Sequence, residues 1–86
     1  MKDRYFCIAT SVVGGDQSPF EFVHYVHPKP HASVKGAWLY GLRNLERDDD
    51  FNIGVLRDGH WVATLWGPDG EVVDDEPEVL VGIPLP

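Results

Sequence analysis

The dipeptide Asp58-Gly59 is the sequence feature that most constrains the fold of this chain. It separates two runs of strand-forming residues, 51–57 and 60–66. Asp-Gly between such runs favours a two-residue type I′ turn, because both turn positions need positive φ angles. A loop of two residues joins neighbouring antiparallel strands. The sequence therefore predicts an antiparallel β-hairpin over residues 51–66.

Further strands are predicted on both sides of this hairpin. Residues 5–13 and 20–27 are rich in aromatic and β-branched side chains, which is typical of strands, and the turn-forming residues between them indicate a second hairpin. The segment 67–70 has the composition of a type I turn, so residues 71–74 should form a short strand. The apolar segment 79–85 contains glycine and proline, which favours an edge strand or an extended tail.

A single helix is predicted from about Ser33 to Arg47, between the two pairs of strands. Ser33 is a suitable N-cap residue. Apolar side chains recur through this segment with the spacing of one helix face: Val34, Ala37, Trp38, Leu42 and Leu45. Gly41 lies on the same stripe, one turn after Ala37. Two small residues on one face predict that the helix backbone approaches the sheet closely there.

These elements define one α+β domain that spans residues 1–86. The predicted order is ββαβββ, an antiparallel sheet of about five strands with one helix packed on one face. No repeat or low-complexity linker divides the chain, and its length suits a single domain.

The two-residue turn also predicts which side chains share a face of the sheet. Leu56 should lie opposite Trp61, and their face should pack against the helix that carries Trp38. The opposite face should then carry an apolar cluster: Phe51, Ile53, Val55, Val62 and Trp66. Leaving such a cluster in water is unfavourable for a small domain. The chain's own C-terminal tail, a second copy of the chain or a different partner could cover it.

The charge is distributed very unevenly. The net charge is −7, and residues 58–86 hold seven acidic side chains with no Lys or Arg. A strongly acidic chain is poorly suited to bind nucleic acid or an anionic membrane directly. The acidic third, including Asp74, Asp75 and Glu76, has two interpretations. It is a solvated rim that maintains solubility, or a patch that faces a basic partner, such as a protein that handles nucleic acid.

Two further observations bear on location and redox chemistry. No segment approaches the roughly 20 apolar residues of a membrane span, and the N-terminus lacks a signal-peptide layout, so we expect a cytoplasmic protein without a membrane partner. Cys7 is the only cysteine, which excludes an intrachain disulfide. Because it lies in an apolar run, we expect it to be a small buried hydrophobic residue.

No catalytic, metal or cofactor motif meets its chemical requirements in this sequence. His24 and His27 should lie on opposite faces of a strand, and His31 lies beyond two prolines, so we do not expect the three to bind a metal. The segment 48–52 (Asp-Asp-Asp-Phe-Asn) resembles the start of a calcium loop, but the glycine and glutamate that such a loop needs later are missing. No serine has the context of a nucleophile elbow. We assign no catalytic residue and expect no cofactor.

The function predicted from these patterns is that of a non-enzymatic interaction module, such as an inhibitor or an accessory factor, that binds a protein partner. The predicted binding residues are aromatic, apolar and acidic side chains: Leu39, Tyr40, Phe51, Ile53, Val55, Val62, Trp66, Asp74, Asp75 and Glu76. One alternative is a homo-oligomeric structural or scaffold subunit, with a homodimer as the expected assembly. The other is an enzyme or small-ligand binder with its site at a dimer seam.

Overall fold

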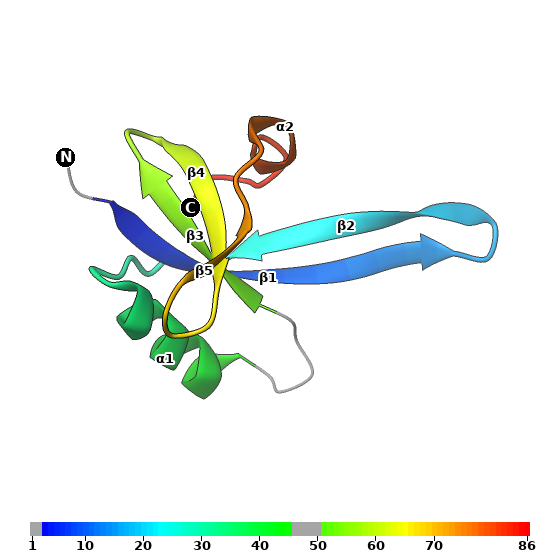
Figure 1. The fold of residues 1–86 in the computed structure, drawn as a ribbon. Coiled ribbons are helices and arrows are strands. Elements are labelled where there is room, and N and C mark those ends of the chain that lie inside the picture. Colours follow the sequence, from blue (N-terminus) through cyan, green and yellow to red (C-terminus); the bar gives the residue numbers. More distant parts are fainter. Residues whose placement is uncertain (1–2, 46–50) are drawn as a thin grey trace.

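A five-stranded antiparallel sheet forms the centre of the computed structural model, which describes residues 3–45 and 51–86 (Figure 1). The strands are β1 (Arg4–Gly15), β2 (Ser18–Val26), β3 (Phe51–Arg57), β4 (His60–Trp66) and β5 (Glu71–Asp74). Their order across the sheet is β2-β1-β3-β4-β5. Helix α1 (Val34–Asn44) connects β2 to β3, and the short helix α2 (Pro77–Leu80) follows β5. The predicted α+β class and the order ββαβββ are confirmed.

Helix α2 replaces the edge strand or extended tail that the sequence predicted for the first part of segment 79–85. Pro77 occupies the start of this helix and Glu78 lies in its first turn. Both residues favour a helix N-terminus, because proline has the required φ angle and the carboxylate interacts favourably with the helix dipole.

The central hairpin confirms the predicted turn but not the predicted register. Asp58 and Gly59 have φ angles of 53° and 81°, as a type I′ turn requires. Leu56 lies opposite Trp61 as expected, but Val55 lies opposite Ala63, because β4 contains a bulge at this point. A regular two-residue hairpin predicts Val55 opposite Val62. That pairing is wrong, and every pair beyond it is shifted by one residue.

Helix α1 covers the face of the sheet that we expected to lie opposite the helix. Ile53 and Val55 of β3 share a buried cluster with Cys7 of β1 and Ala37 of α1. The predicted assignment of the two faces is thus reversed. Its physical reason is that the ring of Phe51 packs on Gly41 of the helix, where a Cβ atom would overlap it, whereas Ile8 and Trp61 fill the space over Gly54 on the other face.

The opposite face is covered by α2 and the residues that follow it. Leu80 and Ile83 are buried there against β1 and β4 residues. The indole Nε1 of Trp61 donates hydrogen bonds to the carbonyl oxygens of Ile83, at 3.2 Å, and Pro84, at 3.3 Å. The C-terminal tail therefore does fold back on the sheet, but on the face opposite to the one predicted.

Helix α1 begins as predicted and ends earlier. The hydroxyl of Ser33 accepts a hydrogen bond from the backbone N–H of Gly36 at 3.0 Å, which confirms the N-cap. The helix ends at Asn44, and Leu42 is exposed although it was placed on the buried stripe. Arg47 and the predicted helix stop at 48–50 lie outside the described residues. Within the described ranges, no helix has the length and apolar character needed to cross a membrane.

The N-terminal hairpin extends well beyond the rest of the domain (Figure 1). Among the described residues, strand β1 pairs with β3 from Arg4 to Ala9, whereas it pairs with β2 as far as its last residue, Gly15. Residues 10–24 therefore form a projecting two-stranded ribbon, which we call the arm. It gives the molecule an elongated shape of 45 × 28 × 21 Å.

Candidate interaction surface

Four of the predicted binding residues lie in or against the core under α1. Phe51, Ile53 and Val55 have only 6, 0 and 6% of their surface exposed, and Val62 is half-buried against the same cluster. We predicted them to form an apolar cluster on the face opposite the helix, where the tail, a second copy or a partner could cover them. That expectation is corrected, because the reversed faces place them where a partner cannot reach them in the folded domain.

Trp66 remains at the surface beside an aromatic cluster. It is 45% exposed, and its ring packs edge-on against Trp38 at a centroid distance of 4.8 Å. Trp38 in turn contacts the ring of Phe51 at 4.9 Å. Trp66 thus shields core aromatics and presents part of its own ring to solvent.

Leu39 and Tyr40 occupy different environments on α1. Leu39 is 41% exposed. Tyr40 is half-buried, with its ring against His27 at 5.1 Å and His31 at 4.8 Å, and the ammonium group of Lys29 lies 4.9 Å from the ring centre. Tyr40 therefore packs the connection between β2 and α1 against the helix. Of these two residues, Leu39 is the one with a largely exposed side chain.

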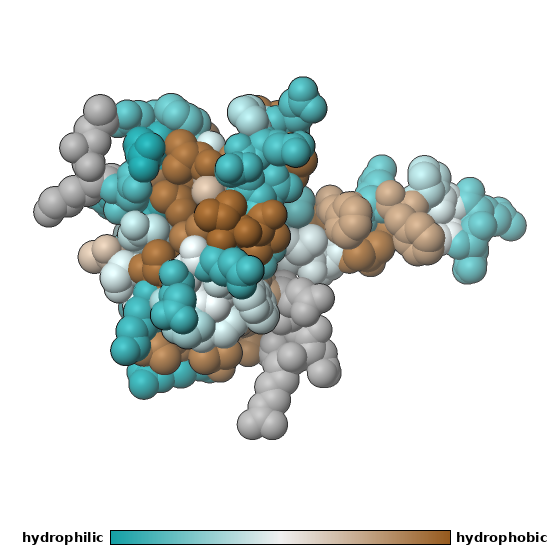
Figure 2. Space-filling view, in the orientation of Figure 1, coloured by the Kyte–Doolittle hydropathy of each residue, from teal (hydrophilic) through white to brown (hydrophobic). Residues whose placement is uncertain are grey.

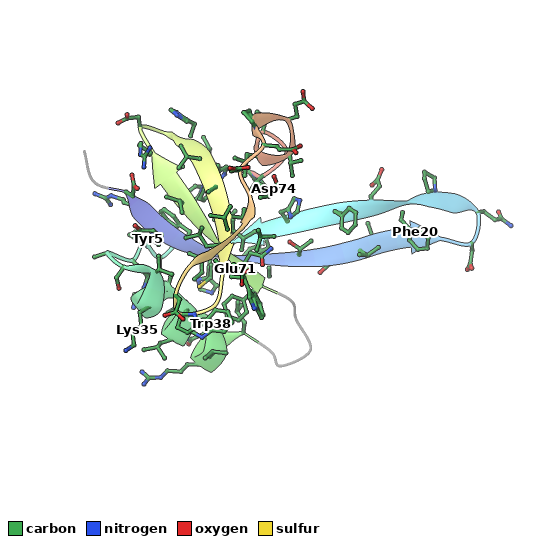
Figure 3. The ribbon with its side chains drawn as sticks, viewed as in Figure 1. Tyr5, Phe20, Lys35, Trp38, Glu71 and Asp74 are labelled. Carbon is green, nitrogen blue, oxygen red and sulfur yellow. The ribbon has the colours of Figure 1, made fainter. Side chains whose placement is uncertain are left out.

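The acidic residues lie on the connection between β5 and α2. A carboxylate oxygen of Asp74 accepts a hydrogen bond from the backbone N–H of Glu76 at 2.9 Å, so this residue stabilises the turn before α2. Asp75 and Glu76 are exposed. Figure 3 shows Asp74 on the body of the domain and Phe20 far out on the arm. The acidic and aromatic surfaces are therefore separate.

The arm carries the most exposed aromatic side chains of the described chain. Phe20 and Phe22 are 72% and 68% exposed. Several aliphatic or aromatic residues accompany them on the arm and at its base: Val12, Val13, Val23 and Tyr25. In Figure 2 the middle of the arm is hydrophobic and its tip is hydrophilic. Contiguous apolar surface of this kind is typical of an interaction site.

The sequence determines the arm's local geometry. Gly14, Gly15 and Asp16 at its tip have positive φ angles, and Gly14 has no room for a side chain because the carbonyl of Pro19 lies against it. Near the base, Thr10 Oγ1 and His24 Nδ1 are hydrogen-bonded across the strands at 2.9 Å. An isolated two-stranded ribbon is only marginally stable in water.

Sequence reasoning predicted both arm strands but missed the surface that they form. The signal was present in the strand lengths: the runs 5–13 and 20–27 are longer than the runs 51–57 and 60–66. When long strands pair with shorter neighbours, the excess residues must project. The apolar residues on both faces of that excess then remain exposed.

The histidines and the cysteine do not form a reactive centre. His27 and His31 approach one another through Tyr40, but no cluster of three metal-binding side chains occurs among the described residues. Burial raises the pKa of the Cys7 thiol to about 11, and its Sγ donates to the carbonyl oxygen of Ala37 at 3.0 Å. This thiol is protonated at neutral pH and poorly suited to act as a nucleophile.

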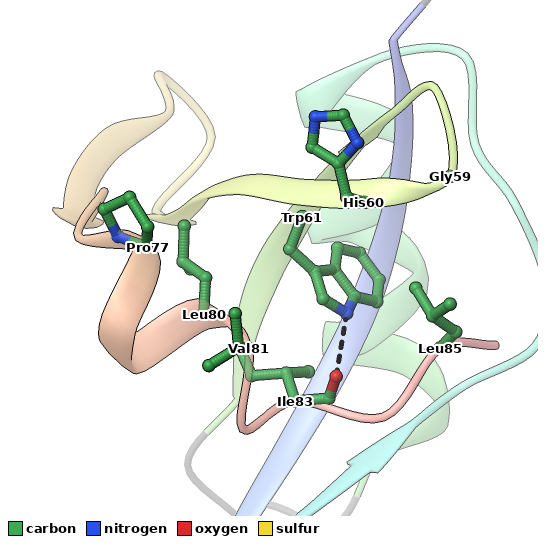
Figure 4. Close-up of a pocket in the computed structure, with 8 residues that line it drawn as sticks. All are labelled: Gly59, His60, Trp61, Pro77, Leu80, Val81, Ile83 and Leu85. Carbon is green, nitrogen blue, oxygen red and sulfur yellow. Dashed lines mark hydrogen bonds between the residues drawn. The ribbon is translucent and has the colours of Figure 1, made fainter.

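A small apolar pocket lies between β4 and the C-terminal segment (Figure 4). Its volume is about 320 Å³, and its walls include His60, Trp61, Pro77, Leu80 and Ile83. The indole N–H of Trp61 already donates to the C-terminal backbone, so His60 provides the one ionisable side chain of the lining. The pocket offers few polar groups to orient a substrate.

These features define a class of protein: a small α+β domain with both sheet faces covered and an apolar β-ribbon projecting from one side. Comparisons with family models, curated proteins and solved structures found no match to this chain. The candidate function therefore depends on the geometry of the arm itself.

Proposed function

We propose that this chain is a small acidic interaction module without enzymatic activity, and that it binds a protein partner through the arm. The observation that carries the proposal is the exposure of Phe20 and Phe22 on a ribbon that projects from an otherwise covered sheet. Aromatic side chains dominate the binding energy of protein interfaces. Full burial of one such side chain contributes about 1.5–3 kcal/mol.

The chemistry of the described residues supports a non-catalytic role. Cys7 is buried and protonated, and the pocket beside Trp61 combines one histidine with apolar walls. General acid–base or nucleophilic catalysis requires several such groups within hydrogen-bonding distance of one another. Binding therefore accounts for the arrangement better than catalysis does.

The acidic segment has a secondary place in this proposal. Asp75 and Glu76 are exposed on the body, where they favour approach to a basic partner through long-range attraction. This contribution should weaken as salt is added, because exposed charges are screened. A double reversal of Asp75 and Glu76 to lysine tests it, since these residues leave the Asp74 turn intact.

Paired variants test the binding role of the arm. Phe20→Ser with Phe22→Ser removes two exposed aromatic side chains from the arm, whereas Val73→Ser with Val81→Ser removes two exposed apolar side chains from the body. Chemical cross-linking and light scattering on each protein, alone and with cell extract, would detect the complexes formed. We expect the wild type and the body variant to form the same complexes, and the arm variant to lose them. An arm variant that keeps every complex would contradict the proposal.

A further inference from the structure

Among the described residues, the outer edge of β2 has unpaired backbone groups from Phe20 to Val26. Strand β2 is the first strand in the sheet order, and within the described residues it pairs only with β1. The register of β1 and β2 places His27, just after β2, opposite Cys7 of β1. The backbone N–H of His27 donates a hydrogen bond to the carbonyl oxygen of Cys7 at 2.8 Å. In an antiparallel strand, both backbone groups of one residue point the same way. His27 thus fixes which residues of β2 point inward.

Alternation from His27 directs the backbone of the even-numbered residues from Val26 to Phe20 outward, up to the register shift that precedes the pair Gly15–Ser18. Phe20, Phe22 and His24 therefore present N–H and C=O groups to solvent at this edge. Pro19, which has no N–H to donate, lies at an inward position, and its carbonyl lies against Gly14 of β1. The proline in this strand thus leaves the donors of the outer edge intact.

The outer edges of two β2 strands can pair with each other symmetrically about Phe22. If two copies of β2 pair antiparallel with Phe22 opposite Phe22, then Phe20 lies opposite His24 and Glu21 lies opposite Val23. Opposed residues in such a ladder share a face, so the aromatic rings gather on one side. Glu21 is the one charged residue of β2, and this register keeps it away from its own copy.

The tip of the arm and the segment that follows β2 carry opposite charges in the same arrangement. Asp16 lies at the tip, and Lys29 follows β2 just beyond its base. In the antiparallel register the tip of one copy lies beside the base of the other, so Asp16 approaches the basic segment that contains Lys29. The overall charge of −7 opposes self-association, but the acidic third of the chain lies outside β2.

The bodies of two such copies do not obstruct each other. With Phe22 at the centre, Val26 of one copy and Val26 of the other are eight residues apart along the shared ladder, or about 27 Å. Each body then extends away from the centre in the opposite direction, because the arm projects from one side of the domain (Figure 1).

The other edge of the sheet is unsuited to the same use. Strand β5 has four residues and carries Glu71 and Asp74 at its ends. Short, charged edge strands discourage pairing with other strands. A contact between two β2 edges also closes on itself through two-fold symmetry, so it yields a dimer and not a fibre.

Resting on the function proposed above, we infer that the occupant of the arm is a second copy of this chain, joined edge to edge through β2 in an antiparallel ladder centred on Phe22. The arms then form one four-stranded ribbon with apolar faces. A sheet needs three or more strands with a hydrophobic face to be stable in water on its own. The four-stranded ribbon meets this condition, and the two-stranded arm does not.

Amide hydrogen exchange on the full chain tests the register without mutation. In a dilute sample, the amides of Phe20, Phe22 and His24 should exchange rapidly, while those of Glu21 and Val23 are protected by β1. At high concentration all five should be protected. Even-numbered amides that stay fast at every concentration, while sedimentation shows a dimer, would place the contact elsewhere and overturn the inference.

A proline substitution separates backbone pairing from side-chain docking. Phe22→Pro removes an N–H that the β1–β2 ladder does not use, so the monomer should fold, whereas the dimer loses both symmetry-related hydrogen bonds at its centre. Its dissociation constant should rise by about thirtyfold more than that of the matched variant Phe22→Ala. Equal weakening by both variants would overturn edge pairing. Circular dichroism checks that each variant is folded.

One outcome distinguishes failure of this inference from failure of the proposed function. A wild-type chain that sediments as a monomer at all concentrations, yet loses a captured protein when Phe20 and Phe22 become serine, would overturn the second copy while the arm remains a binding element. A monomer whose captured proteins do not depend on the arm would overturn both.

Discussion

Gly41 illustrates how one residue determines the distance between α1 and the sheet. A glycine in a helix interior costs up to about 1 kcal/mol relative to alanine, yet here the ring of Phe51 occupies the space that a Cβ atom would need. Gly41→Ala should therefore destabilise the domain by about 1–3 kcal/mol, because overpacking outweighs the gain in helix propensity. Urea unfolding followed by fluorescence measures this change.

Gly36→Ala provides the matched control in the same helix. The nearest atom to a new Cβ there is the hydroxyl oxygen of Ser33 at 3.0 Å, which needs to move by only a few tenths of an ångström and can keep its hydrogen bond to the backbone N–H of residue 36. We expect this variant to be neutral or slightly stabilising. If both alanine variants behaved alike, the close approach at Gly41 would have no energetic consequence.

His31 should make the stability of the domain depend on pH. Burial lowers its pKa, and the positive charges of Lys29 and His27 lower it further; its ring also packs on Tyr40. The unfolded chain, with a histidine pKa near 6.5, then binds more protons than the folded chain as the pH falls below that value. Stability is therefore full above about pH 6.5 and decreases toward and through the lowered pKa.

The variant His31→Gln isolates this contribution because glutamine does not titrate. Urea midpoints at pH 7.5 and 5.5 should differ less for the variant than for the wild type. His60→Gln, at an exposed position beside the Asp58-Gly59 turn, is the control and should keep the wild-type difference. A wild-type difference in the His31 variant would contradict the prediction.

At the scale of elements, α2 is short but belongs to the core. Leu80 is 3% exposed and contacts the cluster on the second face of the sheet. Leu80→Ala should cost about 2–5 kcal/mol. Val81 is 82% exposed, so Val81→Ala should change stability by less than about 0.5 kcal/mol. Chemical unfolding of both variants tests this; equal effects would show that the C-terminal segment is not docked in solution.

The elements also show what the sequence could and could not predict. Local rules sufficed for the Asp58-Gly59 turn, the Ser33 cap and the strand at 71–74, because each depends on a few neighbouring residues. The bulge near Val62 has no local signal of this kind. It shifted the register of every pair beyond Leu56 and Trp61.

The candidate site was harder to predict because exposure depends on the partners of each strand. Phe20 and Phe22 have the composition of core residues, and only the short pairing between β1 and β3 leaves them in water. Ile53 and Val55 look similar in sequence but lie under α1. The pattern of apolar residues therefore identified strands correctly without identifying which of them a partner can reach.

At the scale of the whole molecule, a dimer joined through the arms should link folding to concentration. Mass action stabilises the folded state when folded chains associate and unfolded chains do not. For a domain of this size, a tenfold increase in concentration above the dissociation constant should raise the midpoint of thermal unfolding by about 3–5 °C. Phe22→Pro should show no such increase, and Val81→Ser should retain it. Differential scanning calorimetry over a hundredfold range of concentration measures all three proteins. A wild-type midpoint that does not depend on concentration would show that the arm contributes nothing to folding through self-association.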